Sequence, residues 1–82
     1  MPNNDISLKV ATPAGVFMGI FEKTTKIIEV IKKIIKKQGL EEGDDFDLFY
    51  QGKALQPEER PLVSFHLPDE VCLELVATGS GV

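Results

Sequence analysis

The chain has 82 residues, of which 43% are hydrophobic and 27% are charged, a balance that is ordinary for a globular protein. A chain of this length forms one domain and buries about 60% of the surface of its unfolded state. Its formal net charge of −4 argues against nucleic acid as the main partner. No apolar run approaches the roughly 20 residues of a membrane-spanning helix, so we expect no membrane association.

The single cysteine, Cys72, rules out an internal disulfide bond and suits a reducing compartment. Residues 1–5 are polar and show no signal-peptide character. We therefore expect a cytoplasmic monomer, in which residues 6–77 form the domain and residues 1–5 and 78–82 are flexible.

The first two predicted elements are strands joined by a tight turn. Residues 6–10 alternate apolar and polar side chains, which is typical of a half-buried strand. Residues 12–15, TPAG, favour a turn because proline fixes φ and glycine tolerates positive φ. Residues 16–21, VFMGIF, are apolar on both faces, although a hairpin strand in a small domain normally keeps one face in water. Gly19 within this strand indicates a bulge or a close backbone approach.

Residues 25–39, TKIIEVIKKIIKKQG, predict one amphipathic helix that lies on the sheet. Thr24 or Thr25 can cap its first turn, since a threonine oxygen accepts from the free amides there. Gly39 suits the left-handed position after the last turn, with Leu40 packing back onto the helix. One face carries an apolar stripe, which consists of Ile27, Ile28, Val30, Ile31, Ile34 and Ile35. The opposite face carries lysines that we interpret as solvated, namely Lys32, Lys33, Lys36 and Lys37.

The second half of the chain predicts three more strands. Residues 46–50, FDLFY, form the third strand, and a two-residue turn leads to a short strand at 53–55. A surface loop at 56–61 and a short helical turn at 62–67 precede the last strand, VCLELVA, at 71–77. The simplest closure places the first and last strands side by side, in parallel, at the centre of a mixed sheet of four or five strands. The helix then covers one face, which is the α+β arrangement called β-grasp.

Several stretches resemble ubiquitin, in register over residues 6–77. The helix end KKQGL is similar to the ubiquitin helix end, and LFYQGKAL at residues 48–55 is similar to LIFAGKQL. Leu62, Phe65 and Leu67 match the spacing of buried Leu, Tyr and Ile in that family. LELV at residues 73–76 resembles its LHLV. The resemblance implies a β-grasp fold and a protein that is recognised by other proteins.

The resemblance also implies a recognition patch on the sheet face opposite the helix. Ubiquitin has an Ile, a His and a Val there, which Phe49, Glu74 and Val76 match, so an acid replaces the His. The second apolar row of the first hairpin widens this patch, and the Gly-Lys pair after the LFYQ stretch matches the family. The residues expected to bind partners are therefore Phe49, Val76, Glu74, Met18, Ile20, Gly52 and Lys53.

The C-terminal tail departs from the ubiquitin pattern of two arginines and a final Gly-Gly. Residues 77–82 contain no arginine, and Ser80 separates Gly79 from Gly81. Gly81 is the expected conjugation residue, and it becomes a terminal carboxylate only after removal of Val82. Glycine suits this role because a tail without Cβ atoms can thread a narrow enzyme channel.

Catalytic and metal-binding interpretations are weaker than structural ones. Cys72 has no convincing catalytic partner, because His66 does not fit that role. A cysteine on a strand is far more often a packing residue than a nucleophile. The acidic residues at 41–47 lack the spacing of a calcium-binding loop, and no other ligands cluster with His66. No glycine pattern matches a phosphate-binding loop. We expect no enzymatic activity, no cofactor and no metal.

Two classes of function follow. As a ubiquitin-like modifier, the chain would be trimmed by a protease, activated as an acyl adenylate, passed to the thiol of an activating or conjugating enzyme, and joined to a target amine. As a non-covalent interaction module, or a domain of a larger protein, it would bind a receptor of ubiquitin-like domains. A sulfur carrier of the same fold is a third and weaker alternative. The glycine-bearing tail favours the first, and the Gly-Ser-Gly-Val ending favours the second.

Overall fold

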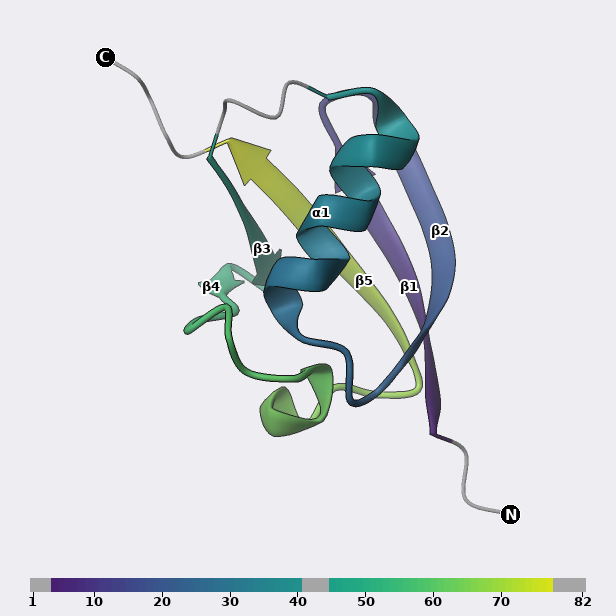
Figure 1. The fold of residues 1–82 in the computed structure, drawn as a ribbon, viewed down its shortest axis with the longest axis vertical. Coiled ribbons are helices and arrows are strands. Elements are labelled where there is room, and N and C mark those ends of the chain that lie inside the picture. The colour runs from purple at the N-terminus through teal and green to yellow at the C-terminus, as the bar shows by residue number, and fades with distance from the viewer. Residues whose placement is uncertain (1–3, 41–44, 78–82) are drawn as a thin grey trace.

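The computed structural model describes residues 4–40 and 45–77, which form a five-stranded mixed sheet with one helix across one face (Figure 1). The elements in chain order are β1 (Asp5–Thr12), β2 (Gly15–Glu22), α1 (Ile27–Gln38), β3 (Phe46–Tyr50), β4 (Lys53–Ala54), the 3-10 helix η1 (Leu62–Phe65) and β5 (Glu70–Ala77). The order of strands across the sheet is β2-β1-β5-β3-β4. The predicted α+β architecture is confirmed.

The centre of the sheet is the predicted parallel pair of first and last strands. Ser7 of β1 lies opposite Glu70 of β5, and Ala11 lies opposite Glu74. On its other side β5 pairs antiparallel with β3. Because side chains alternate along each strand, the residues between the buried positions of β1, β5 and β3 point away from α1.

The hairpin of β1 and β2 pairs without interruption from Asp5 opposite Glu22 to Thr12 opposite Gly15, so the predicted bulge at Gly19 is wrong. A Cβ atom at Gly19 would lie 3.0 Å from Cζ of Phe17 and 3.4 Å from Cε1 of Phe21. Glycine leaves room here for the two aromatic rings, which are its nearest neighbours in place of another backbone.

The N-terminus of α1 is capped by backbone groups from a distant loop. The N-cap residue is Lys26, which makes no side-chain capping hydrogen bond, so the predicted threonine cap is wrong. The N–H of Ile27 donates to the carbonyl of Arg60 at 3.0 Å, and the N–H of Ile28 donates to the carbonyl of Glu58 at 3.0 Å. These carbonyls satisfy amides that a helix otherwise leaves free.

The C-terminus of α1 is as predicted. Gly39 has φ 69° and ψ 31°, in the left-handed region, and its N–H donates to the carbonyl of Ile35. The N–H of Leu40 also donates to Ile35, at 3.0 Å, and its side chain packs against the core.

The core lies between α1 and the sheet and contains the apolar stripe of the helix. Seven residues of the predicted core are at most 3% exposed, namely Ile27, Val30, Ile34, Leu48, Leu62, Leu73 and Leu75. Leu67 differs, because it is only partly buried and packs against the edge of this cluster. The sheet therefore has one face covered by α1 and one face free for contact.

Candidate functional site

The outer face of the sheet brings together part of the predicted patch. Phe49 of β3 pairs with Glu74 of β5, and Val76 of β5 pairs with Asp47, so Phe49 and Val76 are diagonal neighbours on adjacent strands. Val76 is 42% exposed, whereas Phe49 is half-buried. We call Phe49, Glu74 and Val76 the β3–β5 patch.

The other two apolar residues of the predicted patch lie at the far edge of the sheet. Met18 pairs with Lys9 and Ile20 pairs with Ser7, so β1 and β5 separate them from β3. They form an exposed row on β2, which we call the edge row and which consists of Val16 (57% exposed), Met18 (71%) and Ile20 (69%). The predicted apolar residues therefore belong to two surfaces.

The two remaining predicted positions lie in the turn after β3 and in β4. Gln51 and Gly52 have φ values of 51° and 83°, a pair of left-handed conformations typical of a two-residue hairpin turn. Lys53 follows this turn, pairs with Tyr50 and is exposed. Because opposed residues share a face, Lys53 lies on the face of Tyr50, which is opposite to that of Phe49, and is not part of the β3–β5 patch.

A groove between β2 and α1 was not recognised from the sequence. Its main part has a volume of about 580 Å³ and is lined on the helix side by Glu29, Lys32, Lys33 and Lys36. Its continuation, of about 440 Å³, reaches Phe17, Lys37 and Gln38.

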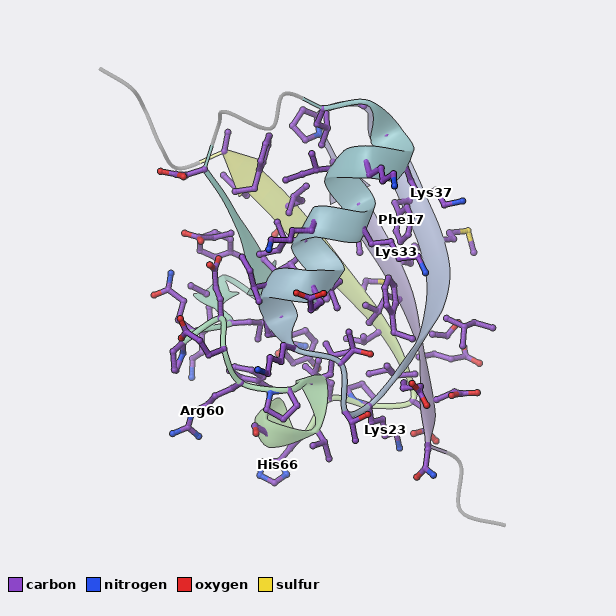
Figure 2. The ribbon with its side chains drawn as sticks, in the orientation of Figure 1. Phe17, Lys23, Lys33, Lys37, Arg60 and His66 are labelled. Carbon is purple, nitrogen blue, oxygen red and sulfur yellow. The ribbon has the colours of Figure 1, made fainter. Side chains whose placement is uncertain are left out.

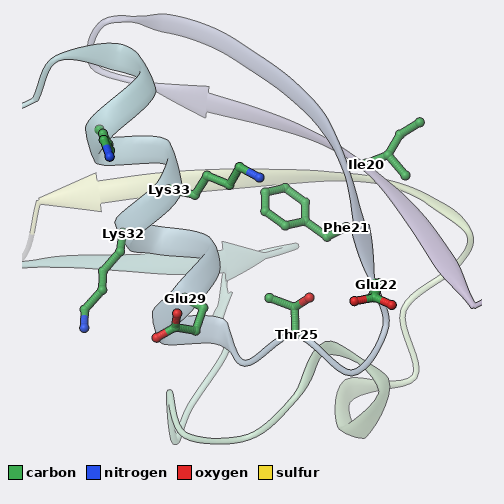
Figure 3. Close-up of a pocket in the computed structure, with 8 residues that line it drawn as sticks. Ile20, Phe21, Glu22, Thr25, Glu29, Lys32 and Lys33 are labelled. Atoms are coloured by element: carbon green, nitrogen blue, oxygen red, sulfur yellow. The ribbon is translucent and has the colours of Figure 1, made fainter.

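The helix lysines at this groove are exposed, and one of them, Lys33, also lies over an aromatic ring. Nζ of Lys33 lies 5.6 Å from the centre of the Phe21 ring, on the helix-facing side of β2 (Figure 3). Ile20 points away from the helix on the other side of the same strand. The ring centres of Phe17 and Phe21 are 6.2 Å apart, so two aromatic side chains form an apolar floor. Figure 2 shows Lys33 and Lys37 of α1 beside Phe17 of β2.

The sequence signal for this groove was divided between two elements. Residues 16–21 are apolar on both faces, and the lysines of α1 recur on one side of the helix. Only the placement of β2 at the sheet edge brings the two features together.

Carboxyl groups gather near β3 and the loop that follows β4. The pKa of Glu58 is raised from 4.5 to about 7, chiefly by burial and then by a hydrogen bond with Asp47. The negative charges of Asp47, Glu59 and Asp45 also oppose ionisation of Glu58. The raised pKa of Glu58 makes this corner of the sheet sensitive to pH.

The candidate catalytic residues lie on different elements. Cys72 is exposed on the outer face opposite Lys9, so it is not the packing residue that we expected. His66 follows η1 with φ 53° and is exposed at that end of the molecule (Figure 2). Among residues 4–40 and 45–77, His, Cys, Asp and Glu form no group of three or more that could hold a metal ion. The same residues include no helix with the length and apolarity to cross a membrane.

Comparison with known proteins decides the fold. No family model and no curated protein sequence matches the chain. A protein designed on the basis of ubiquitin is similar in structure, with a TM-score of 0.81 and 21% identity over 98% of this chain and 96% of that chain. This chain has the ubiquitin-like β-grasp fold.

A natural ubiquitin-like domain agrees with this assignment. The ubiquitin-like domain of the Arabidopsis thaliana protein At2g32350 has a TM-score of 0.77 and 17% identity over 92% of this chain and 79% of that chain. At such identity the likeness concerns the ubiquitin-like fold alone. The β3–β5 patch, the edge row and the groove must therefore be interpreted from this chain's own residues.

Proposed function

We propose that this chain acts by binding other proteins non-covalently through the β3–β5 patch. The observation that carries the proposal is the adjacency of Phe49, Glu74 and Val76 on the sheet face that α1 leaves uncovered. Val76 and the exposed part of Phe49 supply apolar surface, and Glu74 supplies a charge between them. A matching partner presents an apolar side chain next to a basic group.

The pairing pattern supports one continuous contact area. Ala11 of β1 and Ala54 of β4 flank the row of Glu74 and Phe49, and both are exposed. Small side chains at these positions allow a partner to reach the central residues.

Quantitative affinity capture tests this proposal. The purified chain and its Phe49→Ala variant are immobilised and exposed to lysate, and bound proteins are compared by mass spectrometry. A partner for which Phe49 is a binding hot spot should lose more than about 1 kcal/mol of binding free energy, while the variant stays folded. Lys26→Glu, an exposed change at the N-cap of α1, serves as the control. Equal recovery of every partner by all three proteins would contradict the proposal.

Covalent modification of other proteins is a second candidate. β5 ends at Ala77, directly after Val76 of the β3–β5 patch. An enzyme that binds this patch is well placed to receive the tail. Gly79, Gly81 and Val82 lie outside the described residues, and the modifier role rests on the sequence of the tail together with this placement.

Truncation separates the candidates. If the chain is a modifier, deleting Val82 should allow a thioester to form between Gly81 and the thiol of a cognate activating enzyme, and deleting Gly81 as well should abolish it. A sulfur carrier would instead accumulate as a thiocarboxylate, which intact-mass measurement distinguishes from a thioester. If the full chain and both truncations behave alike, non-covalent binding is the function that remains.

A further inference from the structure

A shallow hollow lies on the outer face of the sheet, above Ser7 of β1. Ser7 is opposite Ile20 of β2 on one side and opposite Glu70 of β5 on the other, so the three side chains form one row on the same face. Serine is the smallest of the three, and a space of about 260 Å³ lies between its larger neighbours. We call this space the outer hollow, and its lining consists of Asp5, Ile6, Ser7, Ile20, Asp69 and Glu70.

The two walls of the outer hollow differ in chemistry. Ile20 points away from α1 (Figure 3) and is 69% exposed, and Met18, its neighbour in the edge row, is 71% exposed. The opposite wall carries the carboxylate of Glu70, and Asp5 lies on the same face of β1 as Ser7. A side chain that fits this space offers apolar surface to one wall and a positive charge to the other.

The acidic wall is held in place by contacts with two other segments. The N–H of Ser7 donates to the carbonyl of Asp69 at 2.8 Å, which fixes the start of β5 beside β1. Nζ of Lys23 lies 2.9 Å from Oδ1 of Asp69, so this carboxylate already has a cation. Glu70 is the next residue along the chain and is exposed. We therefore assign the binding of an incoming cation to Glu70.

Lys9 limits where a cation can lie on this face. A second hollow, of about 250 Å³, continues from Ser7 and Glu70 towards Lys9 and Met18, which lie opposite each other. The ammonium group of Lys9 repels a positive charge at that end. The cationic group of a ligand therefore belongs beside Glu70, and its apolar part belongs beside the edge row.

We propose that the outer hollow binds an arginine side chain of a partner protein, and that an apolar side chain of the same partner lies on the edge row. The planar guanidinium group presents several N–H donors, which suit the carboxylate of Glu70 and the hydroxyl oxygen of Ser7 together. Its methylene groups lie along Ile20. Lysine fits less well, because its ammonium group is a compact and strongly hydrated point charge. This inference goes beyond the proposed function, since the outer hollow shares no residue with the β3–β5 patch.

A second copy of the chain is a poorer occupant of the outer hollow. The sequence contains one arginine, Arg60, which is exposed on the loop before η1. The residue before it is Glu59, whose carboxylate would approach the acidic wall together with the guanidinium group. Repulsion between these like charges favours a partner whose arginine has neutral or basic neighbours.

The experiment titrates the full chain with the blocked tripeptide Leu-Ala-Arg, whose first and third side chains lie on one side when it is extended. The comparison peptide is Leu-Ala-citrulline, which has nearly the same shape and no charge. Binding is followed by the NMR chemical shifts of Ser7, Ile20 and Glu70. We expect these residues to shift with Leu-Ala-Arg, and we expect this peptide to bind at least about threefold more tightly than the comparison peptide.

Variants of the chain test the roles of the acidic wall and of the small side chain between the walls. Glu70→Gln should weaken binding of Leu-Ala-Arg at least about threefold and leave binding of Leu-Ala-citrulline unchanged. Glu59→Gln is the charge-matched control, because it removes an exposed carboxylate from the loop after β4 and should have no effect. Ser7→Leu fills the outer hollow and should weaken binding of both peptides.

Each contrary outcome overturns this proposal. Equal binding of the two tripeptides would show that the outer hollow does not select a cation. Equal weakening by Glu70→Gln and Glu59→Gln would reveal only a general attraction to a negatively charged chain. Self-association of the free chain that is lost in Arg60→Gln, measured by analytical ultracentrifugation, would make a second copy the occupant. Phe49→Ala tests the proposed function on a separate surface, so the two results are independent.

Discussion

The two edges of the sheet differ in length and in chemistry. At one edge, β4 has 2 residues, both exposed, and one of them is Lys53. At the other edge, β2 has 8 residues and carries the apolar edge row. Natural sheets blunt their edges with short strands and lysines, since an open edge invites pairing with other chains. The β4 edge follows this rule and the β2 edge does not, so the strand order puts β2 at the edge, whereas the exposed apolar row on it is a property of this sequence.

The largest expected effect comes from creating a cavity in the core, on which both edges of the sheet depend. Ile34 of α1 is 0% exposed, and Ile34→Ala should lower the free energy of unfolding by about 2–5 kcal/mol because a cavity remains. Urea denaturation measures this loss, and hydrogen exchange should accelerate at both edges. Ile28→Ala is the matched control, because Ile28 is only half-buried and should cost less. Equal costs for the two variants would mean that the stripe is not packed as described.

A smaller effect should distinguish the β2 edge from the β4 edge. Gly19→Ala places a Cβ atom 3.0 Å from the Phe17 ring, so the ring must move, at a cost of about 1 kcal/mol. Urea denaturation gives the cost, and NMR should show shifts in Phe17 and Phe21 but none in β4. Val16→Ala on the same strand should change stability by less than about 0.5 kcal/mol. A gain of about 0.4–1 kcal/mol for Gly19→Ala would mean that the ring moves without cost and would contradict the account.

The smallest effect concerns the acidic corner near β4. The pKa of Glu58 is about 7 in the folded chain and 4.5 without its surroundings, so folding favours the protonated form. Its contribution to stability is complete below about pH 4.5 and is lost as the pH rises through about 7. The contribution should stay below about 1 kcal/mol, because Glu58 is only half-buried and water screens it.

Thermal unfolding between pH 5 and pH 8 checks this contribution, in the range set by the raised pKa of about 7. The melting temperature should fall as the pH rises, and Glu58→Gln should flatten the dependence. Glu74→Gln, on the outer face of β5, is the control and should leave the slope unchanged. A slope that survives in Glu58→Gln would assign the titration to another group.

The elements were predictable because their signals are local. The alternation in residues 6–10 and the Ile/Val stripe of α1 each lie within one segment, and Gly39 marks a helix end by its own conformation. The N-terminus of α1 was not predictable in the same way. Its first amides are satisfied by carbonyls of Glu58 and Arg60, which lie far along the chain and leave no local motif.

The sequence predicted which residues belong to the candidate surfaces, but not which of these residues are neighbours. Phe49 and Val76 proved to be neighbours, whereas Met18 and Ile20 lie at the other side of β1 and β5. Which outward residues meet depends on the order of strands, and this order is a property of the whole chain. The groove was not predictable for the same reason, because its aromatic floor and its lysines belong to different elements.

The parallel pairing of β1 and β5 has a consequence for how the protein is made. Ser7 lies opposite Glu70, so the central contact of the sheet joins residues separated by nearly the whole chain. A ribosome releases β1, β2 and α1 first, and the position between β1 and β3 stays vacant until β5 emerges. Contacts of such long sequence separation form slowly. Folding of this domain is therefore completed only after β5 has been synthesised, and a chain truncated before β5 exposes apolar side chains of β1 and β3 that are otherwise buried.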